Sequence, residues 1–172
     1  MADFNDFATE KTAQMEMDYY TQRFVLWPKQ FKSLSVSISL DWKKVRFSPS
    51  NTAAVEEKPG IYAFAVQHAD PALPPNGYIT YIGQTGGKAA HRTLRDRFGD
   101  YLREKERPKR PHVHHMLNKW DDYLVFYFAA VDTSQTDLEL LEDQLNDALI
   151  PPYSKGDYSA DIRKRKGIWE VS

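Results

Sequence analysis

Cysteine is absent from the 172 residues of this chain, which excludes disulfide bonds, thiolate zinc sites and a cysteine nucleophile. No run approaches the roughly 18 apolar residues that a membrane-spanning helix needs, and the N-terminus lacks the charged-then-apolar pattern of a secretion signal. These absences predict a cytoplasmic protein without a membrane partner. The chain does contain material for a core, because 41% of its residues are hydrophobic and 13% are aromatic.

Charge is nearly balanced over the whole chain, with 23 basic against 24 acidic residues, but it is distributed unevenly. Residues 88–110 hold nine Lys or Arg against four acids, and residues 155–166 hold five against two. Clustered cations are what a phosphate backbone requires, although a solvated helix face would look the same. The candidate nucleic-acid contacts are Lys88, Arg92, Arg95, Arg103, Lys109 and Arg110.

Residues 1–58 differ in character from the rest and are predicted to form an arm packed on the main domain. The stretch from Phe7 to Trp27 contains no Gly or Pro and predicts a helix that ends before Pro28. Apolar residues at every second position from Leu34 to Leu40 predict a half-buried strand. The function of this arm cannot be inferred from these patterns.

The pattern from residue 59 to residue 154 predicts one domain with strands first and helices on the flanks. Strands are expected at Ile61–Val66, Tyr78–Gln84 and Asp122–Val131, and helices at about Ala89–Glu106, His112–Trp120 and Thr136–Ile150. A turn-rich loop with three prolines, residues 68–77, joins the first two strands into a hairpin. Without a βαβ series, the class is α+β, with a small three-stranded antiparallel sheet flanked by helices. Residues 155–172 form a basic tail.

Two tyrosines flanked by glycine lie on the neighbouring strands of this hairpin, in Gly60-Ile61-Tyr62 and Tyr81-Ile82-Gly83. A single strand tyrosine is most often a packing residue at the edge of a core. Because side chains alternate along a strand, Ile61 and Tyr62 must face opposite sides of the sheet.

Two later helices each place polar side chains at the margin of an apolar stripe. Arg97 and Tyr101 lie one turn apart at the edge of the stripe on the first long helix. Glu142 lies on the margin of the leucine face of the last helix, where a carboxylate is incompletely solvated and needs a cation, either a metal or an arginine. Alone, Arg97 would be a surface charge and Glu142 a salt-bridge partner.

In this order and on these elements, the two tripeptides, Arg97, Tyr101 and Glu142 together resemble the GIY-YIG nuclease domain, over residues 59–154. The resemblance implies a metal-dependent endonuclease that hydrolyses phosphodiester bonds in DNA with one Mg²⁺ or Mn²⁺ per active site. It implies Glu142 as the metal ligand and Arg97 as the phosphate clamp. It also implies Tyr62 as the water-activating tyrosine and Tyr81 as its hydrogen-bonding neighbour, and Tyr101 stands where members often carry His or Tyr.

A tyrosine base is chemically demanding, because the ordinary pKa of tyrosine is about 10 and a nearby cation must lower it. Lys88, Arg95 or the metal-bound water are the candidate sources. The sequence departs from the family pattern at Ser154, where asparagine is common, and in a longer loop between the two strands. One metal site cuts one strand, so duplex cleavage implies a homodimer or two binding events. The alternatives are a catalytically idle GIY-YIG module that binds nucleic acid, or a protein-interaction scaffold.

Overall fold

The computed structural model describes residues 4–34, 36, 38–87, 91–154, 158–160 and 162–164. Its elements in chain order are α1 (Phe4–Tyr20), α2 (Pro28–Ser33), β1 (Lys43–Arg46), η1 (Pro49–Ala54), β2 (Gly60–Val66), β3 (Tyr78–Thr85), α3 (Leu94–Glu106), α4 (Pro111–Lys119), η2 (Asp121–Tyr123), β4 (Leu124–Ala130) and α5 (Leu138–Leu149). The predicted Lys88 and most of the predicted basic tail, residues 155–172, lie outside the described residues.

The sheet has four antiparallel strands in the order β1-β4-β2-β3, which confirms the α+β class and corrects the expectation of three strands. The additional strand, β1, comes from the N-terminal arm and pairs with residues 125–128 of β4. It forms where apolar side chains can reach the core, since Val45 is half-buried and Phe47 is buried. The arm therefore contributes directly to the sheet of the main domain.

The strand predicted between Leu34 and Leu40 is wrong, because no described position of this stretch belongs to a strand. Val36, Ile38 and Leu40 are nevertheless partly buried against the core beneath α5. A strand needs a free backbone edge as well as an apolar face, and β1 occupies the neighbouring edge of β4. The alternating apolar residues of this stretch therefore pack against the core, but their backbone does not pair with a strand.

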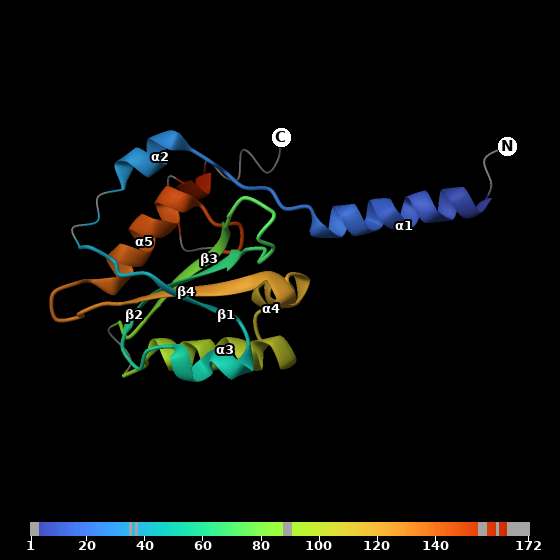
Figure 1. Cartoon of the computed structure of the whole chain (residues 1–172). Coiled ribbons are helices and arrows are strands. Elements are labelled where there is room, and N and C mark those ends of the chain that lie inside the picture. Colours follow the sequence, from blue (N-terminus) through green and yellow to red (C-terminus); the bar gives the residue numbers. More distant parts are fainter. Residues whose placement is uncertain are drawn as a thin grey trace.

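The two faces of the sheet carry two separate cores, as the opposite orientations of Ile61 and Tyr62 require. One core contains Tyr62 and Phe64 and lies under α3 and α4. The other contains Ile61 and lies under α5. Figure 1 shows α3 and α5 on opposite sides of the strands, with α2 beyond α5. Any site near Tyr62 is therefore built on the α3 side of the sheet.

The N-terminal helix ends earlier than predicted and projects from the body (Figure 1). It closes at Thr21, whose backbone N–H and hydroxyl both donate to the carbonyl of Met17. Residues 11–20 are exposed, and near the end of the helix the Tyr19 ring contacts His115 of α4 with ring centres 5.8 Å apart. Its end is anchored to α4, where Lys119 Nζ donates to the Thr21 carbonyl at 3.1 Å. Among the described helices, none has both the length and the apolar character to cross a bilayer.

The helices that carry the candidate site residues have well-defined ends. The α3 helix begins at a capping box, in which the Thr93 side chain accepts from the Asp96 N–H and the Asp96 carboxylate accepts from the Thr93 N–H. The α5 helix begins at Asp137, whose carboxylate accepts from two backbone N–H groups. It ends at Ile150, which has a left-handed φ of 45° and precedes two prolines. These ends set where Arg97 and Glu142 lie along their helices.

Gly60 is required by the close approach of β2 to β4. A Cβ at this position would lie 2.1 Å from the carbonyl oxygen of Ala129, a backbone atom that cannot move aside. We expect Gly60→Ala to lower the free energy of unfolding by about 1–3 kcal/mol, as overpacking of a core does. The measurement is urea denaturation, with Gly77→Ala as the control, because no atom lies within 4 Å of a Cβ at Gly77. Equal stability of the two variants would contradict this role.

Candidate active site

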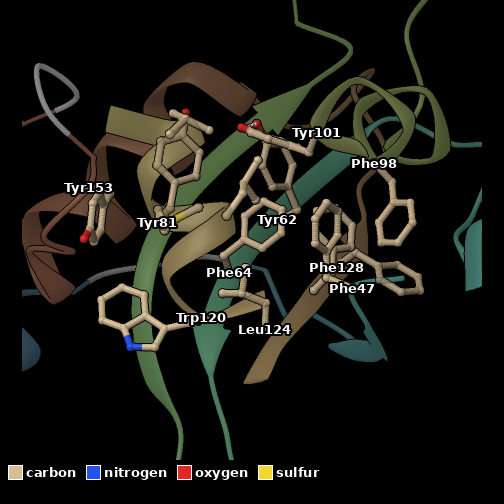
Figure 2. Close-up of a cluster of buried hydrophobic side chains, with 14 of the residues drawn as sticks. Phe47, Tyr62, Phe64, Tyr81, Phe98, Tyr101, Trp120, Leu124, Phe128 and Tyr153 are labelled. Carbon is tan, nitrogen blue, oxygen red and sulfur yellow. Dashed lines mark hydrogen bonds between the residues drawn. The ribbon is translucent and has the colours of Figure 1, made fainter. Parts of the chain in front are cut away.

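Tyr62 lies on β2 beneath α3 and is completely buried among aromatic rings (Figure 2). Its ring passes over Gly83, its partner residue on β3. A Cβ on Gly83 would lie 2.3 Å from the Tyr62 hydroxyl oxygen, so the second glycine of the motif leaves room for this phenol. The tyrosine of the first tripeptide therefore packs against the glycine of the second tripeptide across the hairpin.

Arg97 and Tyr101 meet the Tyr62 hydroxyl from α3. Arg97 Nε donates to the Tyr62 hydroxyl oxygen at 3.0 Å, and the hydroxyls of Tyr62 and Tyr101 are 2.9 Å apart. The guanidinium carbon of Arg97 also lies 5.2 Å from the centre of the Tyr101 ring, within the range of a cation–π contact. These contacts join three of the five residues predicted for catalysis, and they hold the arginine in one orientation.

Burial determines the protonation of this cluster. It raises the pKa of the Tyr62 phenol well above its ordinary value, and Tyr101 and Tyr81 add to the rise while Arg97 opposes it. Burial pushes the pKa of Arg97 down, but the hydroxyls of Tyr62 and Tyr101 outweigh this effect, so the pKa of Arg97 is raised. Tyr62 is thus a neutral phenol that orients a charged arginine. This state does not suit the predicted role of Tyr62 as the base that activates water.

Tyr81 joins the cluster through its ring. It stacks on Tyr62 with ring centres 6.4 Å apart, and the Tyr101 hydroxyl lies 2.9 Å from that of Tyr62. The outer edge of β3 is held by the segment after α5, because Tyr153 N–H donates to the Thr80 carbonyl and Ile82 N–H donates to Ser154 Oγ. Ser154, which departs from the family pattern, is therefore a buried support of the Tyr81 strand.

A basic pocket of about 540 Å³ opens beside Arg97 on the α3–α4 side of the molecule. Its lining is Arg92, Arg97, Asp100, Arg103, Glu104, Arg107, Lys109 and Arg110. Five of the six predicted nucleic-acid contacts are among the described residues, and four of these five line the pocket. Arg95 points elsewhere, since it donates to the carbonyls of Ala53 and Val55 and pairs with Glu57. Arg95 therefore anchors the segment around η1.

Asp100 and Glu104 are the two carboxylates of this pocket, and the sequence analysis did not single them out. Asp100 pairs with Arg92 and Arg103 at the rim. Glu104 is 6% exposed and binds the end of the connection to α4. The signal for Glu104 was available in the spacing, because Arg97, Tyr101 and Glu104 follow one another at four and three residues on one helix face.

Glu142 lies half-buried on α5, beside the buried Leu141 and Leu145. The helix α5 packs on the opposite face of the sheet from Tyr62. No group of three or more His, Asp or Glu side chains in the described part of the chain forms a metal site. A single carboxylate does fit Mg²⁺, which proteins often hold through one or two carboxylates plus water and substrate phosphates.

Comparisons with protein-family models, with curated proteins and with solved structures found no match to this chain. The resemblance to GIY-YIG nucleases thus depends on the named residues and remains a hypothesis about function.

The buried Tyr62 predicts a loss of stability in alkali. Above about pH 10, the ordinary pKa of tyrosine, the unfolded chain loses this proton while the folded protein keeps it, so the free energy of unfolding falls as pH rises. One such group contributes a slope of up to about 1.4 kcal/mol per pH unit. Urea denaturation from pH 8 to pH 11 should show a shallower decline for Tyr62→Phe than for the parent. Tyr123→Phe, at an exposed position, is the control and should match the parent slope.

Proposed function

We propose that this protein is a GIY-YIG-type endonuclease that hydrolyses phosphodiester bonds in DNA. One observation carries the proposal: a charged arginine is fixed by two buried phenols at a pocket lined by six cations. A guanidinium in a fixed orientation can bind two oxygens of one phosphate, which favours the charge that develops during phosphoryl transfer. The order of the site residues along the chain supports the same family.

The chain's own residues have distinct roles in this proposal. Arg97 binds the scissile phosphate, and Tyr62 and Tyr101 are positioning residues that hold its guanidinium. Glu142 would hold a Mg²⁺ or Mn²⁺ ion, which supplies Lewis-acid stabilisation of the phosphate and lowers the pKa of bound water. Because the pKa of Tyr62 is raised, a group other than Tyr62 must take the proton of the attacking water. Lys88, at the end of the Gly86-Gly87 turn, is a candidate outside the described residues.

A second candidate function is nucleic-acid binding without cleavage. The raised pKa of the buried Tyr62 favours it, because a phenol that does not act as a base suits a retained fold whose basic pocket binds phosphate. A protein-interaction scaffold built on the projecting α1 is the third alternative. All three functions share the fold, but only the endonuclease requires a divalent cation to change the DNA.

Plasmid nicking separates these functions. We expect purified protein to convert supercoiled plasmid DNA to nicked circles in Mg²⁺ or Mn²⁺, and not in EDTA. Linear product would require a homodimer or two binding events, since one site cuts one strand. Glu142→Ala should abolish nicking while retaining most DNA affinity, and Lys32→Ala, an exposed cation on α2, should act like the parent. Retained DNA binding with no metal-dependent nicking by the parent would establish the binding module instead.

Arg97 and Arg103 predict different kinetic defects. Arg97→Ala should slow single-turnover cleavage by about 10²–10³-fold, as the loss of a fixed transition-state donor does. Arg103→Ala should weaken DNA binding modestly and reduce the salt dependence of the affinity by about one phosphate contact, because Arg103 lies 70% exposed at the rim. The measurements are single-turnover rates and binding isotherms over a range of salt. Equal losses of affinity with unchanged rates would make Arg97 an ordinary backbone contact.

A further inference from the structure

A buried carboxylate shapes the connection between α3 and α4. Glu104 Oε1 accepts the backbone N–H groups of Lys109 at 2.7 Å and Arg110 at 2.5 Å. Its other oxygen, Oε2, accepts from Arg110 Nε at 3.3 Å. Burial raises the pKa of Glu104, but these hydrogen bonds outweigh it and lower the pKa, so the carboxylate stays charged at neutral pH. Glu104 therefore fixes both the backbone and the side chain of Arg110.

Arg97 and Arg110 both contact the ring of Tyr101. Their guanidinium carbons lie 5.2 and 5.0 Å from the centre of that ring. Burial and the charge of Arg97 act to lower the pKa of Arg110, but Tyr101 outweighs them, so the pKa of Arg110 is raised and its guanidinium stays charged. A bound anion would offset the repulsion between the two arginines. The two side chains come from different segments, yet both line one pocket.

Each arginine of this pair has one carboxylate nearby. Asp100 lies 3.8 Å from Arg97 Nη1 but is shared with Arg92 and Arg103 at the rim. Glu104 Oε2 lies 3.3 Å from Arg110 Nε, while its other oxygen binds the backbone of the connection to α4. The lining holds six cations against these two acids, so it retains an excess of positive charge. Such a pocket is suited to more than one phosphate charge.

We propose that the pocket binds two adjacent phosphates of one nucleic-acid strand, with Arg97 on the scissile phosphate and Arg110 on its neighbour. Glu104 is the positioning residue for the second contact. This inference rests on the proposed function, since it assigns the phosphate at Arg97 as the scissile one. It adds a built subsite that selects substrates with at least two consecutive phosphodiesters.

Short oligothymidylates with free hydroxyls at both ends test the two-phosphate site without metal. The dinucleotide carries one phosphate, the trinucleotide two and the tetranucleotide three. For the parent protein in EDTA, fluorescence anisotropy should give about tenfold or tighter binding on the step from dinucleotide to trinucleotide, the size of a charge-assisted contact. The step from trinucleotide to tetranucleotide should be several times smaller. Equal steps would indicate a diffuse basic surface and overturn the proposal.

Variants assign the step to its residues. Arg110→Ala should remove the gain from the second phosphate while leaving dinucleotide affinity nearly unchanged, which also shows that the Arg97 half remains folded. Glu104→Gln should reduce the same gain, and Arg110→Lys should keep part of it, because the charge remains but the fork is lost. Lys32→Ala should reproduce the parent steps. A full second-phosphate gain in both Arg110→Ala and Glu104→Gln would refute the assignment.

The two proposals fail in distinguishable ways. Plasmid nicking with no second-phosphate gain would remove the two-phosphate site and leave the endonuclease. A clear second-phosphate gain at Arg110 with no nicking in any divalent cation would remove the endonuclease and leave a phosphate-binding module.

Discussion

The hydrogen bond from Arg97 to the buried Tyr62 phenol is the interaction on which the site depends. It joins the central strand β2 to the helix α3, and the Tyr101 hydroxyl completes it from the same helix. The absence of a side chain at Gly83 makes room for the phenol. Since both phenols are buried, their hydrogen bonds are electrostatically stronger than they would be in water, and leaving one unmade would be costly. The arginine is consequently presented to the pocket in one orientation before any ligand arrives.

Two carboxylates on α3 have different physical roles although they are four residues apart. Asp100 pairs with exposed arginines at the rim, where solvent screening makes each ion pair weak. Glu104 is buried and binds backbone N–H groups, so it determines the path of the chain into α4. This difference explains how a chain of nearly neutral net charge contains a strongly basic pocket. The two acids of the pocket position its arginines and the backbone before α4, and the six cations of the lining still outnumber them.

The sequence predicted the central hairpin, β4 and the three later helices to within a few residues. These elements are marked by hydrophobic periodicity and proline positions, which depend only on neighbouring residues. The largest difference among them is the start of α3, which the capping box sets at Leu94. The prediction failed in the arm, where the alternation from Leu34 to Leu40 was stronger than that around Val45. The segment that pairs with β4 is Lys43–Arg46. A strand edge exists only in the assembled sheet, so no local pattern in the sequence shows which segment will pair with it.

By itself, the sequence determined which residue types are available and on which elements they lie: the glycine-tyrosine pairs, the helix with Arg97 and Tyr101, and the late glutamate. Only the tertiary structure decided their partners. Tyr62 binds Tyr101 across 39 residues of chain, because β2 points its phenol toward α3. Only folding raised the pKa of that phenol and packed α5, the helix that carries Glu142, on the opposite face of the sheet. Burial and the pairing of distant residues arise from long-range packing, which the spacing along the chain does not specify.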